Sequence, residues 1–182
     1  PHHEDEIAQS EAATGEPFVG TWLHCAHLQM GGEKMARSVG NIERVAELLA
    51  SGISPRALRY ALIAGHYRAS LSYSDASLAA AGAAIERLDT LVAALAGYRE
   101  DRADDHALDD VLAAARSDFA AAMDDDLHVS AALAVVFDLV RDLNRRIDTR
   151  AMSTADAAAA LETLVDLDQV LGFLSDAAQA LG

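Results

Sequence analysis

The chain has 182 residues, of which 52% are hydrophobic but only 5% aromatic, and much of the hydrophobic content is alanine. This composition favours a helical protein over a sheet-rich one, and the length allows one or two small domains. The formal net charge of −15 argues against general affinity for nucleic acids, and the single cysteine, Cys25, excludes an internal disulfide framework.

The first predicted element is a helix from about residue 2 to residue 13, which ends near Gly15. In such a helix His2 and Glu6 stand four residues apart on one face. An imidazole and a carboxylate at this spacing can reach one metal ion, and both are acceptable zinc ligands, although zinc needs a third and often a fourth group. The alternative is an acidic first turn that stabilises the helix dipole, with the histidines merely exposed.

The second predicted element is a strand over residues 19–30, which are rich in apolar and β-forming side chains. Its alternation places Cys25 and His27 on one face and His24 on the other. We expect these three side chains to be ordinary pocket or surface residues rather than a metal site. The glycine pair at residues 31–32 then predicts a tight hairpin turn.

The segment Gly31–Ser38 is the most informative feature of the chain, because it presents Lys34 and Arg37 in a short glycine-led loop. Lysine supplies a point charge and arginine a forked donor that matches phosphate oxygens, so the loop is suited to bind a polyphosphate. Met35 between them is expected to seat the loop by packing. A solvated basic turn is the alternative interpretation.

Two shorter helices are predicted next. Asn41 is a good N-cap for the first, which Gly52 closes. Ser54 and Pro55 begin the second, which ends near Gly65.

Beyond residue 73 the pattern changes to long amphipathic helices with short links. Ser74 caps the first, and Ser153 or Thr154 caps the last. A charged connector over residues 97–105 and an acidic turn at residues 124–126 separate the helices between them. Four such helices predict an antiparallel bundle whose heptad-like leucine stripes form the core.

Several motifs in this order resemble cysteinyl-tRNA synthetase, a class I aminoacyl-tRNA synthetase. They are PHHEDEIAQSEA at residues 1–12, WLH at residues 22–24, and EKMARSVGN at residues 33–41, in which KMARS resembles the KMSKS signature. GHYR at residues 65–68 and MDDDL at residues 123–127 also resemble segments of this family. The resemblance covers nearly the whole chain.

The resemblance implies a mainly α architecture of two parts. Residues 1–73 would be the end of a Rossmann-type catalytic domain, made of a helix, a strand and the KMSKS-like loop, and residues 74–182 an anticodon-binding-type helical domain. The implied reaction is ATP-dependent activation of cysteine, with magnesium, and transfer to tRNA(Cys) in protein biosynthesis. We expect a cytoplasmic protein, a monomer, and no membrane partner.

The resemblance also assigns roles to individual residues. Lys34 and Arg37 would be catalytic, and together with Met35 and Ser38 they would form the ATP site. Arg37 replaces a lysine of the signature and Ala36 a serine, so charge is kept while geometry changes.

The resemblance further implies a zinc site, because the family's two zinc ligands of the opening motif fall on His2 and Glu6. The zinc would receive the thiolate of substrate cysteine, which it binds far better than the hydroxyl of serine.

The HIGH signature and the two cysteine ligands of this family do not occur in the sequence. We therefore expect a piece of a longer protein that is inactive alone. Two alternatives remain: a mycothiol-pathway cysteine ligase, and a non-catalytic truncated paralogue acting as a binding module. Glu6 and the fuller helical domain favour the synthetase, whereas the altered KMARS loop favours the paralogue.

The arginines leave two interpretations open. Those at positions 56, 59 and 68, and those at positions 141–150, could hold a phosphate backbone or could pair with neighbouring acids. His66, Tyr67 and Arg68 could likewise contact the tRNA stem or pack at a helix end.

Overall fold

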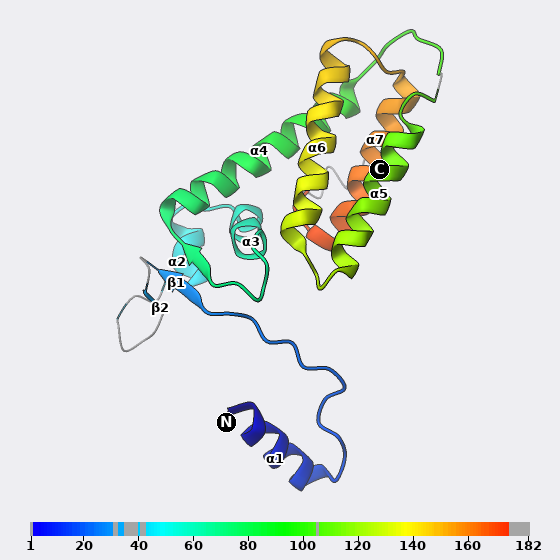
Figure 1. Ribbon diagram of the computed structural model, residues 1–182. Helices are drawn as coiled ribbons and strands as arrows, with labels where there is room; N and C mark the ends of the chain where they lie inside the picture. The colour runs from blue at the N-terminus through cyan, green and yellow to red at the C-terminus, as the bar shows by residue number, and fades with distance from the viewer. Residues whose placement is uncertain (1, 31–32, 35–39, 41–42, 105, 175–182) are drawn as a thin grey trace.

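The computed structural model describes residues 2–30, 33–34, 40, 43–104 and 106–174, and these residues are mainly helical, as predicted. The elements in chain order are α1 (His2–Thr14), β1 (Leu28–Met30), β2 (Glu33–Lys34), α2 (Val45–Ala50), α3 (Pro55–Ile63), β3 (Leu71–Tyr73), α4 (Asp75–Gly97), α5 (Asp109–Asp124), α6 (Val129–Asp148) and α7 (Thr154–Leu171) (Figure 1).

Helix α1 lies apart from the other helices, and an extended segment joins it to β1 (Figure 1). It begins and ends within a residue of the predicted bounds. Its first turn carries the acids Glu4 and Asp5, and none of its residues is buried. Gly15 follows with a φ of +72°, a conformation that glycine adopts without strain, and this stops the helix.

The predicted strand over residues 19–30 is wrong for most of its length, because only Leu28–Met30 forms a strand. β1 pairs antiparallel with β2, with Met30 opposite Glu33, and parallel with β3, with Met30 opposite Tyr73. The strands on either side of residues 31–32 thus pair as a hairpin, while the predicted turn itself lies outside the described residues.

The two short helices follow the predicted order, with one change. Asn41, the predicted N-cap of the first, lies outside the described residues, and α2 begins only at Val45. Gly52, with a φ of +96°, follows α2, and Ser54 precedes α3 as its N-cap residue. Strand β3 was not predicted, since three residues are too few to show an alternating pattern.

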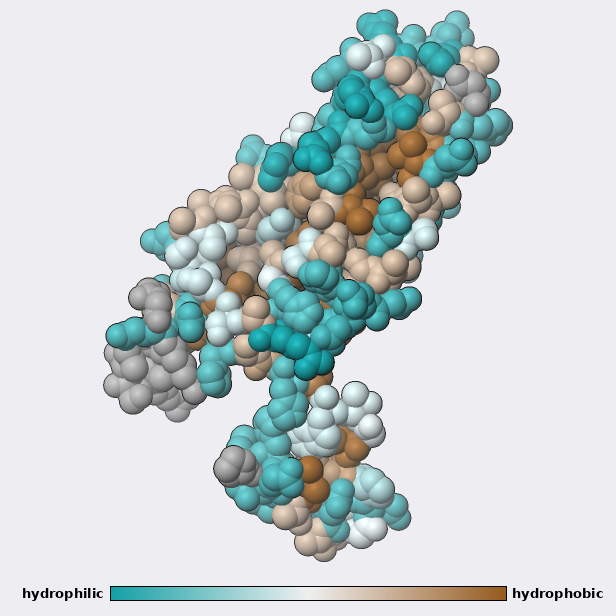
Figure 2. Space-filling model, in the orientation of Figure 1, coloured by the Kyte–Doolittle hydropathy of each residue, from teal (hydrophilic) through white to brown (hydrophobic). Residues whose placement is uncertain are grey.

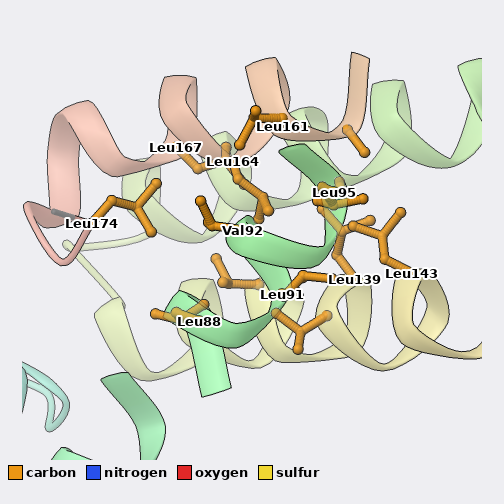
Figure 3. Close-up of a cluster of buried hydrophobic side chains, with 14 of the residues drawn as sticks. Leu88, Leu91, Val92, Leu95, Leu139, Leu143, Leu161, Leu164, Leu167 and Leu174 are labelled. Atoms are coloured by element: carbon orange, nitrogen blue, oxygen red, sulfur yellow. The ribbon is translucent and has the colours of Figure 1, made fainter. Parts of the chain in front are cut away.

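Helices α4 to α7 enclose the main hydrophobic core, in which leucines of α4 lie between those of α6 and α7 (Figure 3). The predicted caps are present: the Ser74 hydroxyl accepts a hydrogen bond from the backbone N–H of Ser77 (3.1 Å), and that of Ser153 from Asp156 (3.0 Å). The residues that separate α4 from α5 over 98–104 have no regular structure, as predicted.

A second, smaller core joins the sheet to the helices. Leu58 of α3, Tyr73 of β3 and Leu78 of α4 are buried together, and Leu28 and Met30 of β1 pack against them. The sheet is therefore held on α3 and on the first turn of α4. On the face shown in Figure 2, hydrophilic and hydrophobic side chains are mixed, and hydrophobic ones show along the helical body and beside α1.

Candidate functional site

The loop that carries the candidate ATP residues begins at the small sheet. Lys34 is the last residue of β2, where its backbone pairs with Gln29 of β1. Met35, Arg37 and Ser38 lie outside the described residues. The sheet thus fixes the point at which the chain enters this loop.

The chain leaves the loop at Glu43, which is also attached to the sheet. The hydroxyl of Tyr73, at the end of β3, donates a 2.7 Å hydrogen bond to Oε2 of Glu43. Tyr73 is only 4% exposed, and its burial together with this hydrogen bond raises its pKa to about 12. The phenol therefore stays a donor at neutral pH, and both ends of the loop are fixed to the β1–β3 pair.

The candidate zinc ligands lie on the exposed side of α1. Nε2 of His2 and Oε1 of Glu6 are 3.9 Å apart, so the helical spacing brings them together as expected. The two side chains are 81% and 47% exposed. Within the described part of the chain, no three histidine, cysteine, aspartate or glutamate side chains gather closely enough to hold a metal ion.

Aromatic rings connect α1 to the segment that follows it. The ring of His3 stacks on Trp22 with centroids 5.5 Å apart and meets the edge of His24 at 4.4 Å. His24 is thus part of an aromatic cluster with His3 and Trp22.

The GHYR motif contacts the turn between α5 and α6. The Tyr67 hydroxyl donates to Oδ1 of Asp126 (2.5 Å), and Arg68 donates to both carboxylate oxygens (2.6 and 3.0 Å). Hydrogen bonds from Arg68 and Tyr67 hold the pKa of the Asp126 carboxyl well below its usual range. These two side chains therefore have an intramolecular role. Asp126 lies in the MDDDL motif, but its contact with Tyr67 and Arg68 was not predicted from the sequence.

The arginines that could have formed phosphate-binding patches have partners within the molecule. Arg56 forms a bidentate pair with Asp89, with both distances at 2.7 Å, and Arg59 donates to the carbonyl of Leu171 (2.5 Å). On α6 and just after it, the pairs are Arg141 with Asp138, Arg145 and Arg146 with Asp142, and Arg150 with Glu100. For Arg56 and for the arginines at residues 141–150 the structure favours pairing with acids, whereas Arg59 is held by a backbone carbonyl.

An apolar groove of about 350 Å³ lies beside the GHYR motif. Its walls come from three segments that are distant in the sequence: the stretch before β1, the end of α3 with the residues that follow it, and the start of α6. Leu62 and Leu127 are among the lining residues and are 42% and 44% exposed. Cys25, the free cysteine, is exposed and also lines the groove.

Two family models match parts of this chain. Residues 1–83 match the family model described as "tRNA synthetases class I (C) catalytic domain", and residues 118–175 match the model described as "DALR domain".

Curated relatives are similar over nearly the whole chain. The Cysteine--tRNA ligase of Pseudomonas paraeruginosa is 42% identical over 171 residues, which cover 94% of this chain and 35% of that protein. The proteins of the same name from Symbiobacterium thermophilum and Methylococcus capsulatus are 44% and 43% identical, over 98% and 96% of this chain. The chain spans 39% and 36% of the length of these two relatives.

Proposed function

The chain belongs to the cysteine–tRNA ligase family, and we propose that it contributes the KMSKS-like ATP loop and the helical tRNA-binding part of such a ligase. The observation that carries the proposal is a loop that starts at Lys34 and has both of its ends tied to one small sheet. A loop held at its ends and rich in cations is suited to follow charge on a polyphosphate.

In the proposed reaction the carboxylate of cysteine attacks the α-phosphorus of magnesium-bound ATP, which forms cysteinyl adenylate and releases pyrophosphate. Lys34 and Arg37 neutralise the phosphate oxygens as negative charge develops on the leaving group, an electrostatic stabilisation of the transition state. Met35 and Ser38 complete the ATP site. A hydroxyl of the terminal ribose of tRNA(Cys) then attacks the activated carbonyl, and AMP leaves.

Zinc fits this chain in part. His2 and Glu6 have the right donor chemistry and lie within reach of one ion, but they supply two ligands, and the described residues offer no third. When bound, zinc would supply affinity for the thiolate of cysteine. We propose that further ligands come from residues outside this chain.

The same proposal divides the chain at residue 73, with a catalytic part that ends a Rossmann-type domain and an antiparallel helical bundle after it. The DALR-domain match over residues 118–175 lies within this bundle, to which we assign the binding of tRNA. None of the helices within the described residues is long and apolar enough to cross a membrane. We propose that the ligase is monomeric and acts in the cytoplasm.

The experiment is a chimaeric ligase in which this chain replaces the matching 171 residues of the Pseudomonas paraeruginosa protein. We expect cysteine-dependent exchange of pyrophosphate into ATP. Lys34→Ala should lower the exchange rate by about 100-fold, because a charge that stabilises the transition state is lost.

The matched control is Arg141→Ala, which removes a cation that is paired with Asp138 on α6. This variant should exchange pyrophosphate at a rate close to that of the parent chimaera. Equal rates for Lys34→Ala and Arg141→Ala would contradict the assignment of the loop.

A further inference from the structure

The turn between α5 and α6 has an unusual backbone. Asp126 and Leu127, two successive residues that are not glycine, have φ values of +54° each. L-residues adopt this left-handed region at a cost, and such residues persist where surrounding contacts hold them. A carboxylate is thereby presented at one fixed position at the end of α5.

Three consecutive side chains converge on this carboxylate from the segment between α3 and β3. Tyr67 and Arg68 donate hydrogen bonds to it, and Nε2 of His66 lies 3.7 Å from Oδ2. The Arg68 guanidinium also lies over the Tyr67 ring, 5.0 Å from its centroid. A bidentate arginine with a stacked partner has a more defined geometry than an ordinary surface ion pair.

Tyr67 carries this contact on to the sheet. Its backbone carbonyl accepts a 2.8 Å hydrogen bond from the N–H of Ala26, two residues before β1. β1 in turn pairs with β2, whose last residue is Lys34. Tyr67 therefore has two contacts. Its side-chain hydroxyl bonds to the α5–α6 turn, and its backbone carbonyl bonds to the segment that leads into β1.

We propose that Asp126 is a positioning residue that couples the α5–α6 turn to the hairpin bearing Lys34, through Tyr67. The coupling itself depends only on contacts within the chain. The consequence of this coupling for catalysis rests on the proposed function. A movement of the helical part, where tRNA would bind, would then displace the hairpin that carries Lys34.

The test is hydrogen–deuterium exchange of the 182-residue chain, without nucleotide or tRNA. Tyr67→Phe removes only the hydroxyl that reaches Asp126 and keeps the carbonyl that reaches Ala26. Asp126→Gly tolerates the positive φ and removes the whole carboxylate, so no side-chain acceptor is left for Tyr67. In each variant we expect amides of residues 26–34 to exchange about fivefold faster, a coupling of ordinary size.

The double variant should exchange no faster than the faster single variant, because both substitutions break one link. Asp138→Asn is the matched control, since it removes an exposed aspartate that pairs with arginine on α6 without contacting the GHYR motif. It should leave exchange of residues 26–34 unchanged.

The proposal is overturned if exchange rises only around residues 124–129 while residues 26–34 keep the parental rate. It is also overturned if Asp138→Asn accelerates residues 26–34 as much as Tyr67→Phe does. Because the measurement contains no substrate, either result leaves the ligase assignment standing, and the chimaera experiment judges that assignment separately.

Discussion

At the scale of single residues, the side chains that organise this molecule are polar groups joined over long sequence distances. Tyr73 and Glu43 are 30 residues apart, and Asp126 lies 58 residues from Arg68. Local spacing in a sequence cannot indicate such pairs. The helical pair of His2 and Glu6 was predictable because four residues make about one helical turn.

The Asp126 contact predicts a particular dependence of stability on pH. The carboxyl has a lowered pKa in the folded protein, so the folded state favours its ionised form. Its contribution is present above the ordinary aspartate pKa of about 4 and is lost as the pH falls below that value. Asp126→Asn should therefore reduce the free energy of unfolding at pH 7 and have a smaller effect near pH 2.5.

Urea unfolding of both proteins at the two pH values measures this difference. Titration of the other carboxyl groups is common to both proteins and cancels in the comparison. A difference in unfolding free energy that stays constant from pH 7 to pH 2.5 would show that the Asp126 carboxylate contributes no pH-dependent stabilisation.

The hydrogen bond that holds the exit of the loop can also be tested. Tyr73→Phe leaves the buried ring in place and removes its donor to Glu43, so we expect a loss of about 1 kcal/mol in unfolding free energy. Glu43→Gln should cost less than this, because an amide oxygen can still accept from the phenol. The measurement is a double-mutant cycle of Tyr73→Phe with Glu43→Ala by urea unfolding, since alanine removes the acceptor; additive effects would contradict a direct interaction.

At the scale of elements, the helices were more predictable than the strands. Ser54, Ser74 and Ser153 stand where helices begin, and apolar periodicity marks their buried faces. The segment over residues 19–27 has strand-like composition but is not a strand in the structure, and Trp22 and Leu23 remain exposed within it. Strand pairing depends on distant segments, which is why β3 and its register with β1 were missed.

The C-terminal end of α7 shows how two elements are joined. Gly172 ends the helix with a φ of +67°, and the buried carboxylate of Asp168 accepts from the N–H groups of Phe173 and Leu174 (2.6 and 3.1 Å). Arg56 of α3 donates to the Phe173 carbonyl (2.9 Å). The positive charge of Arg56 near the C-terminal end of α7 also interacts favourably with the dipole of that helix. Helix α3 is thereby attached to the far end of the chain.

Alanine substitutions at Gly172 and at Gly82 should have opposite effects on the free energy of unfolding. At Gly172, alanine would adopt a left-handed conformation and place its Cβ 3.1 Å from Nε of Arg59, so we expect a loss of about 1–3 kcal/mol. At Gly82, inside α4, an added Cβ meets nothing within 4 Å, and alanine should stabilise the protein by about 0.5–1 kcal/mol. Thermal and urea unfolding of both variants measures these changes; stabilisation by Gly172→Ala would contradict this account of the α7 end.

At the scale of the whole molecule, the strong negative charge remains the main physical obstacle to binding tRNA. The arginines at residues 141–150 are paired with acids, so they do not form a free cationic surface. Recognition would instead have to exchange existing ion pairs for contacts with phosphate, which predicts a shallow dependence of affinity on salt. Measuring the affinity of the chimaera for tRNA(Cys) at two salt concentrations tests this expectation; a steep dependence would indicate many unpaired cations at the interface.

Only part of the fold and of the site could be predicted from the sequence. Motifs and helical spacing led to the family and to the helices, because both are encoded locally. The attachment of the loop to the sheet, and of the sheet to the α5–α6 turn, depends on tertiary contacts of Tyr73 and Tyr67 that no local pattern encodes.

The measurement that tests the central claim most directly is cysteine attachment to tRNA(Cys) by the chimaeric ligase, followed as acid-stable counts of labelled cysteine on the tRNA. The account predicts charging with cysteine and not with serine, and loss of that charging in Lys34→Ala. A folded chimaera that activates cysteine but transfers it only to an amino sugar, or that leaves tRNA(Cys) uncharged while the unaltered relative charges it, would contradict the claim.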